Sequence, residues 1–313
     1  MANPIILDNT KRSTFRQCKM KYFLQHVMGQ QSDYGSTAIR YGTCWHGIQE
    51  GYYQWIKENG WPTSPTENMQ AIAAGLELGR TKWDKESLTK QFFDDYKNFN
   101  TAADAFSYYL DEFAGDKDYL TILATETKFE CPIESENEAE DKLLSKLPPI
   151  IFTGRIDLTV EMDHLVWILD FKTTGWILDK VIMKANRSPQ LIGYSYAGKK
   201  VLGLDTSGCL ASFHYVGASK SKKTGEYGST RYNFRRVPQL YTDEDIAAWK
   251  LSFIDTCREI KYSMDNNLWS ESFDNCYDYG ACQYLRLCQQ HCEYERLNLE
   301  GFHEEFWDVI EEE

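Results

Sequence analysis

The chain has 313 residues, of which 42% are hydrophobic and 14% aromatic, so it can bury a large core as one elaborated domain or as two small ones. Its formal net charge of -13 argues against a protein that binds nucleic acid through its overall charge. The sequence has no run of about eighteen apolar residues, and its first residues do not begin a signal peptide, so we expect a soluble, cytoplasmic protein. In such a compartment, the nine cysteines indicate metal ligands or buried thiols rather than disulfides.

The first predicted helix follows Ser13, whose hydroxyl is a suitable N-cap. Phe15, Cys18 and Tyr22 fall on one face of this helix at the spacing of an apolar stripe. On this pattern alone, Cys18 is a small hydrophobic residue of the core.

A second helix is predicted from Tyr41 to Asn59, ended by Gly60. His46 lies beside the apolar stripe of this helix, where a histidine is more often structural than a ligand. Residues 61–118 are predicted to form a helical insertion that shields the central sheet and makes one wall of a substrate groove. The aromatic residues of this insertion favour core packing over base stacking.

Residues 121–133 are predicted to form the first strand of the central sheet. Glu126 on this strand is a candidate acid that supports a metal site without binding the metal directly. The acidic residues 134–141 are then most simply an exposed connection.

The most informative stretch runs from Phe152 to Thr174. Alternating apolar residues, a polar turn at 161–164 and a second apolar run predict a β-hairpin. Closing the hairpin places Asp157 and Asp170 at one end of the sheet, and Lys172 shares a face with Asp170 because it lies two residues further along. Two neighbouring carboxylates repel each other unless a cation lies between them, and magnesium accepts such oxygen ligands. The spacing alone also fits an aspartate that merely ends a strand.

The charge of the chain is unevenly distributed. Between Lys180 and Arg236 there are eleven Lys or Arg residues against only Asp205 and Glu226, a local balance of +9. This basic segment fits contact with a phosphate backbone, and it equally fits a solvated basic face.

A helix is predicted to begin at Ser188 and Pro189, a favourable N-cap and first-turn pair. Gln190 and Tyr194 lie four residues apart and therefore share a face of this helix. Three further elements are predicted, namely strands at 210–216 and 232–237 and a helix at 242–264.

Four cysteines lie within seventeen residues near the end of the chain, namely Cys276, Cys282, Cys288 and Cys292. Four thiols so close together suggest a soft-metal site. Zinc sites favour pairs of the C-x-x-C type, which this segment lacks. The spacing also fits four buried thiols without any metal.

These motifs resemble those of the PD-(D/E)XK nucleases, in the RecB-like branch. The stretches G-R-I-D at 154–157 and L-D-F-K-T at 169–173 resemble the paired catalytic motifs, with isoleucine in place of the eponymous proline. The stretch G-T-x-x-H at 42–46 resembles the first motif of the branch, and Q-x-x-x-Y at 190–194 resembles its distinguishing motif. Cys18 and the cysteine-rich tail resemble the members that carry an iron–sulfur cluster, such as the AddB subunit, CRISPR-associated exonucleases and phage exonucleases.

The resemblance implies an α/β fold with a restriction-endonuclease-like core, in which helices flank a central mixed sheet of four or five strands. One nuclease domain would span residues 1–313. His46, Asp157, Asp170 and the backbone carbonyl of Phe171 would hold one or two Mg²⁺ or Mn²⁺ ions, and Lys172 would orient the attacking water. Gln190 and Tyr194 would align the substrate strand.

The resemblance further implies a 4Fe–4S cluster in a lobe formed by residues 269–292 with Cys18. Its ligands would be Cys18, Cys276, Cys282 and Cys288, with Cys292 as the alternative last ligand. The implied activity is that of an exonuclease on DNA ends or single strands in recombination, repair or phage DNA metabolism. A helicase or integrase partner protein would fit this role. The alternative is a DNA-end-binding subunit of a helicase or CRISPR adaptation complex whose cleavage is incidental.

Overall fold

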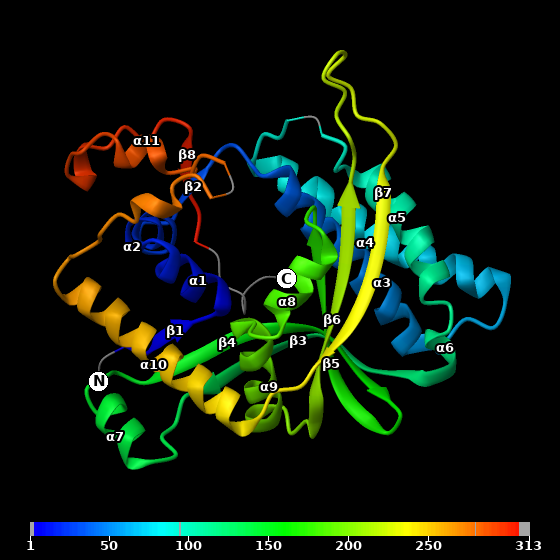
Figure 1. Ribbon diagram of the computed structural model, residues 1–313, viewed down its shortest axis with the longest axis horizontal. Helices are drawn as coiled ribbons and strands as arrows, with labels where there is room; N and C mark the ends of the chain where they lie inside the picture. The colour runs from blue at the N-terminus through cyan, green and yellow to red at the C-terminus, as the bar shows by residue number, and fades with distance from the viewer. Residues whose placement is uncertain (1–2, 94, 279, 307–313) are drawn as a thin grey trace. The chain divides into compact units, whose positions relative to one another are not determined.

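The computed structural model of the protein describes residues 3–306 with the exception of residues 94 and 279 (Figure 1). Within these residues a six-stranded sheet has the strand order β1-β4-β5-β6-β7, and β3 also pairs with β4. β1 with β4 and β5 with β6 are parallel pairs, whereas β4 with β5 and β6 with β7 are antiparallel. The strands are β1 (Ile5–Leu7), β3 (Leu120–Pro132), β4 (Ile150–Met162), β5 (Leu165–Thr174), β6 (Thr206–Gly217) and β7 (Arg231–Gln239).

This arrangement confirms the predicted mixed sheet flanked by helices. The sheet has six strands rather than four or five, since β1 contributes only three residues. So short a run gives no alternating pattern that a sequence reading could use. None of the described helices is both long enough and apolar enough to cross a membrane.

The hairpin of β4 and β5 closes through Asp163 and His164, whose φ angles are 53° and 62°. Two consecutive residues with positive φ are typical of the tight turn that suits the twist of antiparallel strands. The turn fixes the register from Met162 opposite Leu165 onward. The predicted hairpin is therefore present, with its polar turn at the predicted place.

The chain divides into two compact units. The first comprises residues up to Tyr34, Lys128–Arg155, and residues from Asp243 onward. One small cluster of its buried residues contains Leu24, Tyr284 and Leu287. Its helices and short strands are α1 (Asn9–Gln17), α2 (Lys19–Tyr22), the π-helix η1 (Phe23–Val27), β2 (Gln30–Ser32), α7 (Glu138–Leu144), α10 (Asp243–Asp265), η2 (Phe273–Asn275), α11 (Leu285–Cys288), η3 (Tyr294–Arg296) and β8 (Phe302–Glu304).

The first predicted helix is wrong in its start and in the place of Cys18. Helix α1 begins at Asn9 because Asp8 is its N-cap and accepts a hydrogen bond from the Lys11 backbone N–H at 2.7 Å. Cys18 does not lie on a helical face: its backbone is extended, with φ of -162°, and it separates α1 from α2. Its sulfur caps α2 by accepting a hydrogen bond from the Lys21 N–H.

The second unit comprises Gly35–Thr127 and Ile156–Thr242. Its large core is rich in aromatic residues and includes Trp45, Tyr53 and Phe106. Its helices are α3 (Thr37–Asn59), α4 (Pro65–Thr89), α5 (Phe99–Glu112), α6 (Asp116–Tyr119), α8 (Leu178–Ala185) and α9 (Pro189–Val201).

Helices α3 and α4 pack with their main chains in contact. A Cβ atom added at Gly51 of α3 would lie 2.5 Å from the carbonyl oxygen of Ala74. One added at Gly75 of α4 would lie 2.7 Å from the carbonyl oxygen of Ile48. Gly47 and Gly79 make a similar close approach one turn away. Residues with side chains cannot occupy these positions without moving the two helices apart.

His214 on β6 is buried among aromatic rings. Its ring centroid lies 4.1 Å from that of Trp45 and 4.8 Å from that of Phe234. Neither ring nitrogen has a hydrogen-bond partner among the described residues. Burial and, as the smaller cause, the nearby charge of Lys97 lower the pKa of His214 to about 3.

We expect His214→Phe to make the protein less sensitive to acid. An unfolded histidine has a pKa of about 6.5. Between about pH 6.5 and pH 3 the unfolded state therefore binds a proton at this residue, whereas the folded state does not. At pH 4.5 this costs the native protein roughly 2–3 kcal/mol, which the phenylalanine variant does not lose. Urea unfolding at pH 7 and pH 4.5 measures the difference. If the native protein and the variant lose the same stability between pH 7 and pH 4.5, the lowered pKa of His214 is contradicted.

Candidate active site

The two predicted carboxylates lie where strands β4 and β5 stop pairing. The last recorded pair is Leu158 opposite Leu169, and the next pair in this register is Asp157 and Asp170. Here the backbone N–H of Phe171 donates a hydrogen bond to Oδ2 of Asp157 at 2.8 Å. The hairpin thus brings the two aspartates to the same end of the sheet, as the sequence predicted.

Lys172 faces Asp170 on β5. Its Nζ atom lies 2.8 Å from both carboxylate oxygens and donates a hydrogen bond to Oδ1. Asp170 is only 1% exposed, and the Lys172 ammonium compensates the hydration that both of its oxygens have lost. A cation bound at Asp170 would share or take over this contact.

His46 reaches the same place from helix α3. Its Nδ1 atom lies 3.3 Å from Oδ2 of Asp157, and its ring meets that of Phe171 edge to face. Burial lowers the pKa of His46, but the charge of Asp157 outweighs this effect, so the pKa rises. His46 therefore holds a proton more tightly here than in water, unless a cation displaces it.

The two aspartates have opposite pKa shifts. Burial raises the pKa of Asp157, but His46, Lys172 and the Phe171 N–H lower it by more, so its pKa falls below the ordinary value. Burial raises the pKa of Asp170, which stays raised because Lys172 offsets it only in part and the negative charge of Asp157 adds to it. Burial also lowers the pKa of Lys172, yet the two carboxylates raise it overall.

The donor atoms suit a hard divalent ion, with carboxylate oxygens and one imidazole nitrogen. In the described part of the chain, however, no group of three or more His, Cys, Asp or Glu side chains has the arrangement of a metal site. His46 contacts Asp157, and Lys172 rather than an ion neutralises Asp170. The predicted ligand set of His46, Asp157, Asp170 and the Phe171 carbonyl therefore stays a prediction.

Gln190 and Tyr194 lie together on α9, which begins after the Ser188 cap as predicted. The Gln190 side-chain amide donates a hydrogen bond to the Tyr194 hydroxyl at 3.0 Å. Tyr194 is 6% exposed. Their role in aligning the substrate stays a prediction.

Glu126 on β3 is close enough to His46 for its charge to raise the pKa of that histidine. Its φ angle of 46° is unusual for a residue other than glycine, and such strain is often found at functional sites. Tyr53 is a residue of this site that no sequence motif indicates, and its ring stacks on that of Phe171 with the centroids 6.0 Å apart. The pattern that could have indicated it is its spacing of seven residues from His46, which is two turns along one face of α3.

The four predicted cluster cysteines lie near one another in the first unit. The pKa of Cys288 is raised to about 12, mainly by burial and to a smaller extent by the charges of Glu271, Cys18, Cys282 and Cys276. Burial likewise raises the pKa of Cys276, with contributions from Cys282 and Cys18. Two hydrogen bonds join the distant segments: Ser270 accepts one from Met20, and Gln17 accepts one from Asn275. Cys292 is exposed and contributes to neither shift.

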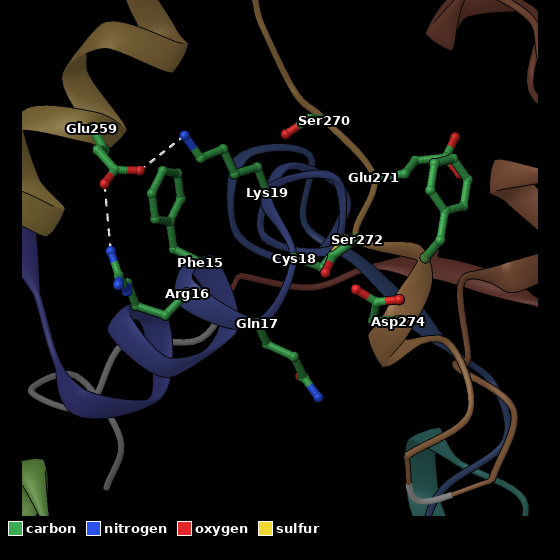
Figure 2. A pocket seen from close by; sticks show the side chains of 11 residues that line it. Phe15, Arg16, Gln17, Cys18, Lys19, Glu259, Ser270, Glu271, Ser272 and Asp274 are labelled. Carbon is green, nitrogen blue, oxygen red and sulfur yellow. Dashed lines mark hydrogen bonds and ion pairs between the residues drawn. The ribbon is translucent and has the colours of Figure 1, made fainter.

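Cys18 also borders a cavity of about 400 Å³ within the first unit (Figure 2). On one side of this cavity Glu259 pairs with Arg16 at 3.4 Å and with Lys19 at 2.9 Å. The thiols of the described residues do not form a closed metal site. Thiolates are the usual ligands of an iron–sulfur cluster, so the donor atoms suit one. The cluster itself stays a prediction for this lobe.

The mixed sheet, with Asp157, Asp170 and Lys172 at its edge, defines a nuclease of the restriction-endonuclease type. Residues 9–289 match the PD-(D/E)XK nuclease superfamily, and the chain belongs to this superfamily. Its members are metal-dependent nucleases that use Mg²⁺ or Mn²⁺. Among solved structures, the chain is similar to the crystal structure of SSO0001, at 10% identity over 79% of this chain and 84% of that chain, with a TM-score of 0.28. That likeness is too remote to bear on function. No curated protein matches the chain.

Proposed function

We propose that the protein is an exonuclease of the RecB-like branch that hydrolyses DNA from ends or in single strands, in recombination, repair or phage DNA metabolism. The observation that supports it best is the group of Asp157, Asp170 and Lys172 at the open end of one hairpin. A module that only binds DNA has no need for two neighbouring carboxylates, one of them fully buried, beside a lysine.

The roles divide among the residues of the site. Bound Mg²⁺ or Mn²⁺ supplies the acidity that turns water into a nucleophile at neutral pH and offsets the charge of the phosphate. Asp157, Asp170, His46 and the backbone carbonyl of Phe171 would hold the ion, and Asp157 keeps its position through the Phe171 N–H. The Lys172 side chain is 36% exposed, so its ammonium is able to reach from Asp170 toward a phosphate oxygen or the attacking water.

The connection between β6 and β7 supplies a surface for the DNA backbone (Figure 1). Lys220, Lys222 and Lys223 are exposed along it, and Lys220 lies 4.9 Å from the Tyr227 ring. The basic segment of the sequence is not one face, however, because Arg236 is buried in an ion pair. The proposed contact with phosphates is confined to this loop and is expected to weaken with salt.

A cleavage assay tests the exonuclease against its alternative. We expect the protein with Mn²⁺ to degrade a linear single strand, to leave a covalently closed circular strand intact, and to lose activity on addition of EDTA. Equal cleavage of the circle would show an endonuclease. Binding to the linear strand without metal-dependent cleavage would favour the DNA-end-binding subunit, which would act with a helicase or integrase partner.

We propose in addition that Cys18, Cys276, Cys282 and Cys288 hold a 4Fe–4S cluster that joins the first helices to the last segment. The electrostatic proximity of these four thiols and the exposure of Cys292 support this set. The cluster would have a structural role, since the small core of this lobe contains few fully buried side chains.

Protein purified without oxygen is expected to contain iron and inorganic sulfide in equal amounts. Cys288→Ser should lose most of both, because one ligand in four is removed, whereas Cys292→Ser should keep them. Elemental analysis measures the outcome. Zinc in place of iron, or the same loss in both variants, would refute the assignment.

A further inference from the structure

Aromatic rings form part of the wall of a pocket in the second unit, five of its twelve lining residues. The pocket has a volume of about 310 Å³, and its aromatic lining consists of Tyr52, Tyr53, Trp61, Tyr109 and Phe113. This volume is at the lower end for small-ligand sites. The pocket therefore suits one planar group, such as a single nucleobase, rather than a length of strand.

The charges around the pocket balance one another. Asp111 and Lys117 are exposed at its lining, one of each sign. The buried carboxylate of Asp116 is neutralised by Arg236, whose two terminal nitrogens lie 2.9 and 3.0 Å from its oxygens. An interior without net charge favours an uncharged ring over a phosphate. The exposed amide of Asn68 offers a donor and an acceptor to the edge of a base.

The wall of the pocket is held in place by hydrogen bonds. The Trp61 indole N–H donates to the carbonyl oxygen of Leu120 at 2.9 Å. The hydroxyls of Tyr53 and Tyr109 lie 2.8 Å apart and share a hydrogen bond. Tyr53 and Tyr109 are almost fully buried, so the partly exposed rings of Trp61 and Phe113 are the ones on which a base can stack. Trp61, fixed by its hydrogen bond, loses little entropy when a base stacks on it, which favours binding.

The pocket is connected to the active site through Phe171. The Tyr53 ring stacks on Phe171 with an angle of 19° between planes, and the His46 ring meets Phe171 edge to face. His46 and Tyr53 are seven residues apart on α3, which is about 10 Å along the helix axis. Since nucleotides in a stacked strand rise about 3.4 Å each, this distance corresponds to about three nucleotides.

We infer that this pocket binds one unstacked base of the substrate strand, within about three nucleotides of the phosphate held at the active site. The inference rests on the proposed nuclease function and adds to it a subsite for a particular nucleotide. Such a subsite makes cleavage depend on a free, unpaired base, because a paired base cannot enter the pocket.

Strands that lack one base test this subsite. The protein used is Asp170→Asn, and the ligands are a short single-stranded oligonucleotide and a series in which one position at a time is abasic. At one position, loss of the base is expected to weaken binding about 5- to 150-fold, the range found for stacking of a base on an aromatic ring. Adding Trp61→Ala should weaken binding of the intact strand similarly and remove the penalty for the abasic position.

Two further variants distinguish a loss of base binding from a loss of folding in Trp61→Ala. Ala114→Trp places a large ring on an exposed position of the pocket lining and should remove the abasic penalty without disturbing the core. Tyr108→Ala removes an exposed ring from α5 outside the pocket lining and should retain the penalty.

The same abasic penalty in Trp61→Ala, Ala114→Trp and Tyr108→Ala would overturn the base pocket. The nuclease proposal would survive that result if the native protein still cleaved DNA with Mn²⁺. Absence of Mn²⁺-dependent cleavage would reject the nuclease itself, whatever the abasic strands show.

Discussion

Asp170→Asn is expected to reduce Mn²⁺-dependent DNA cleavage by about 100-fold or more while the protein stays folded. The change removes a buried negative charge that faces Lys172 and lies beside Asp157. A loss of this size is typical when one electrostatic group is removed from a reaction centre. The fold should survive because Lys172 is 36% exposed and can turn its charge toward water. The initial rate on an end-labelled single strand gives the measurement.

Asp179→Asn is the matched control for that variant. Its carboxylate is 78% exposed on α8 and pairs with Arg235 at 3.6 Å, so its removal changes the net charge equally without touching the site. Calorimetric binding of Mn²⁺ without DNA provides a second readout, in which Asp170→Asn should bind the ion more weakly than Asp179→Asn. Equal cleavage rates in the two variants would remove Asp170 from the proposed mechanism.

Arg236→Met is expected to lower the free energy of unfolding by about 3–5 kcal/mol, the cost of leaving a buried charge without its partner. The Arg236 guanidinium contacts both oxygens of Asp116, donates a hydrogen bond to the Tyr109 hydroxyl, and lies 4.1 Å from the Phe113 ring. After the substitution, Asp116 keeps hydrogen bonds from the hydroxyls of tyrosines but has no cation. Urea unfolding at neutral pH measures the loss.

The neighbouring Arg235→Met provides a strict comparison. Arg235 lies on the opposite face of β7, is 57% exposed, and pairs with an exposed aspartate, so its loss should cost no more than about 1 kcal/mol. The double variant Asp116→Asn/Arg236→Met should recover part of the stability, since neither partner then leaves a charge in the core. Similar losses in the two single variants would contradict the buried ion pair.

Local patterns in the sequence were sufficient to predict the hairpin and the start of α9. Asp157 and Asp170 meet because strand alternation and one short turn fix their register, and both are local features. Ser188 and Pro189 mark a helix start for the same reason. The juxtaposition of the candidate catalytic side chains was therefore predictable, although their roles remain to be tested.

Contacts between distant residues were not predictable in this way. Arg236 was counted with a basic segment, yet its partner Asp116 lies 120 residues earlier, and no local pattern connects them. The extended backbone at Cys18 goes with its role as N-cap of α2, where its sulfur accepts a hydrogen bond from the Lys21 N–H, and this competes with continuation of α1. The contribution of Glu126 to His46 likewise depends on how β3 lies against α3.

The contact of α3 with α4 through their glycines has a mechanical consequence. A helix whose main chain rests on that of its neighbour cannot slide along its axis, because side chains such as that of Ile48 would be driven into space that admits only hydrogen atoms. The helix itself fixes the spacing of His46 and Tyr53, and the contact with α4 fixes the position of both residues along the helix axis. Deleting α4 would not simply remove an appendage: it would expose the polar backbone of the helix that sets this spacing.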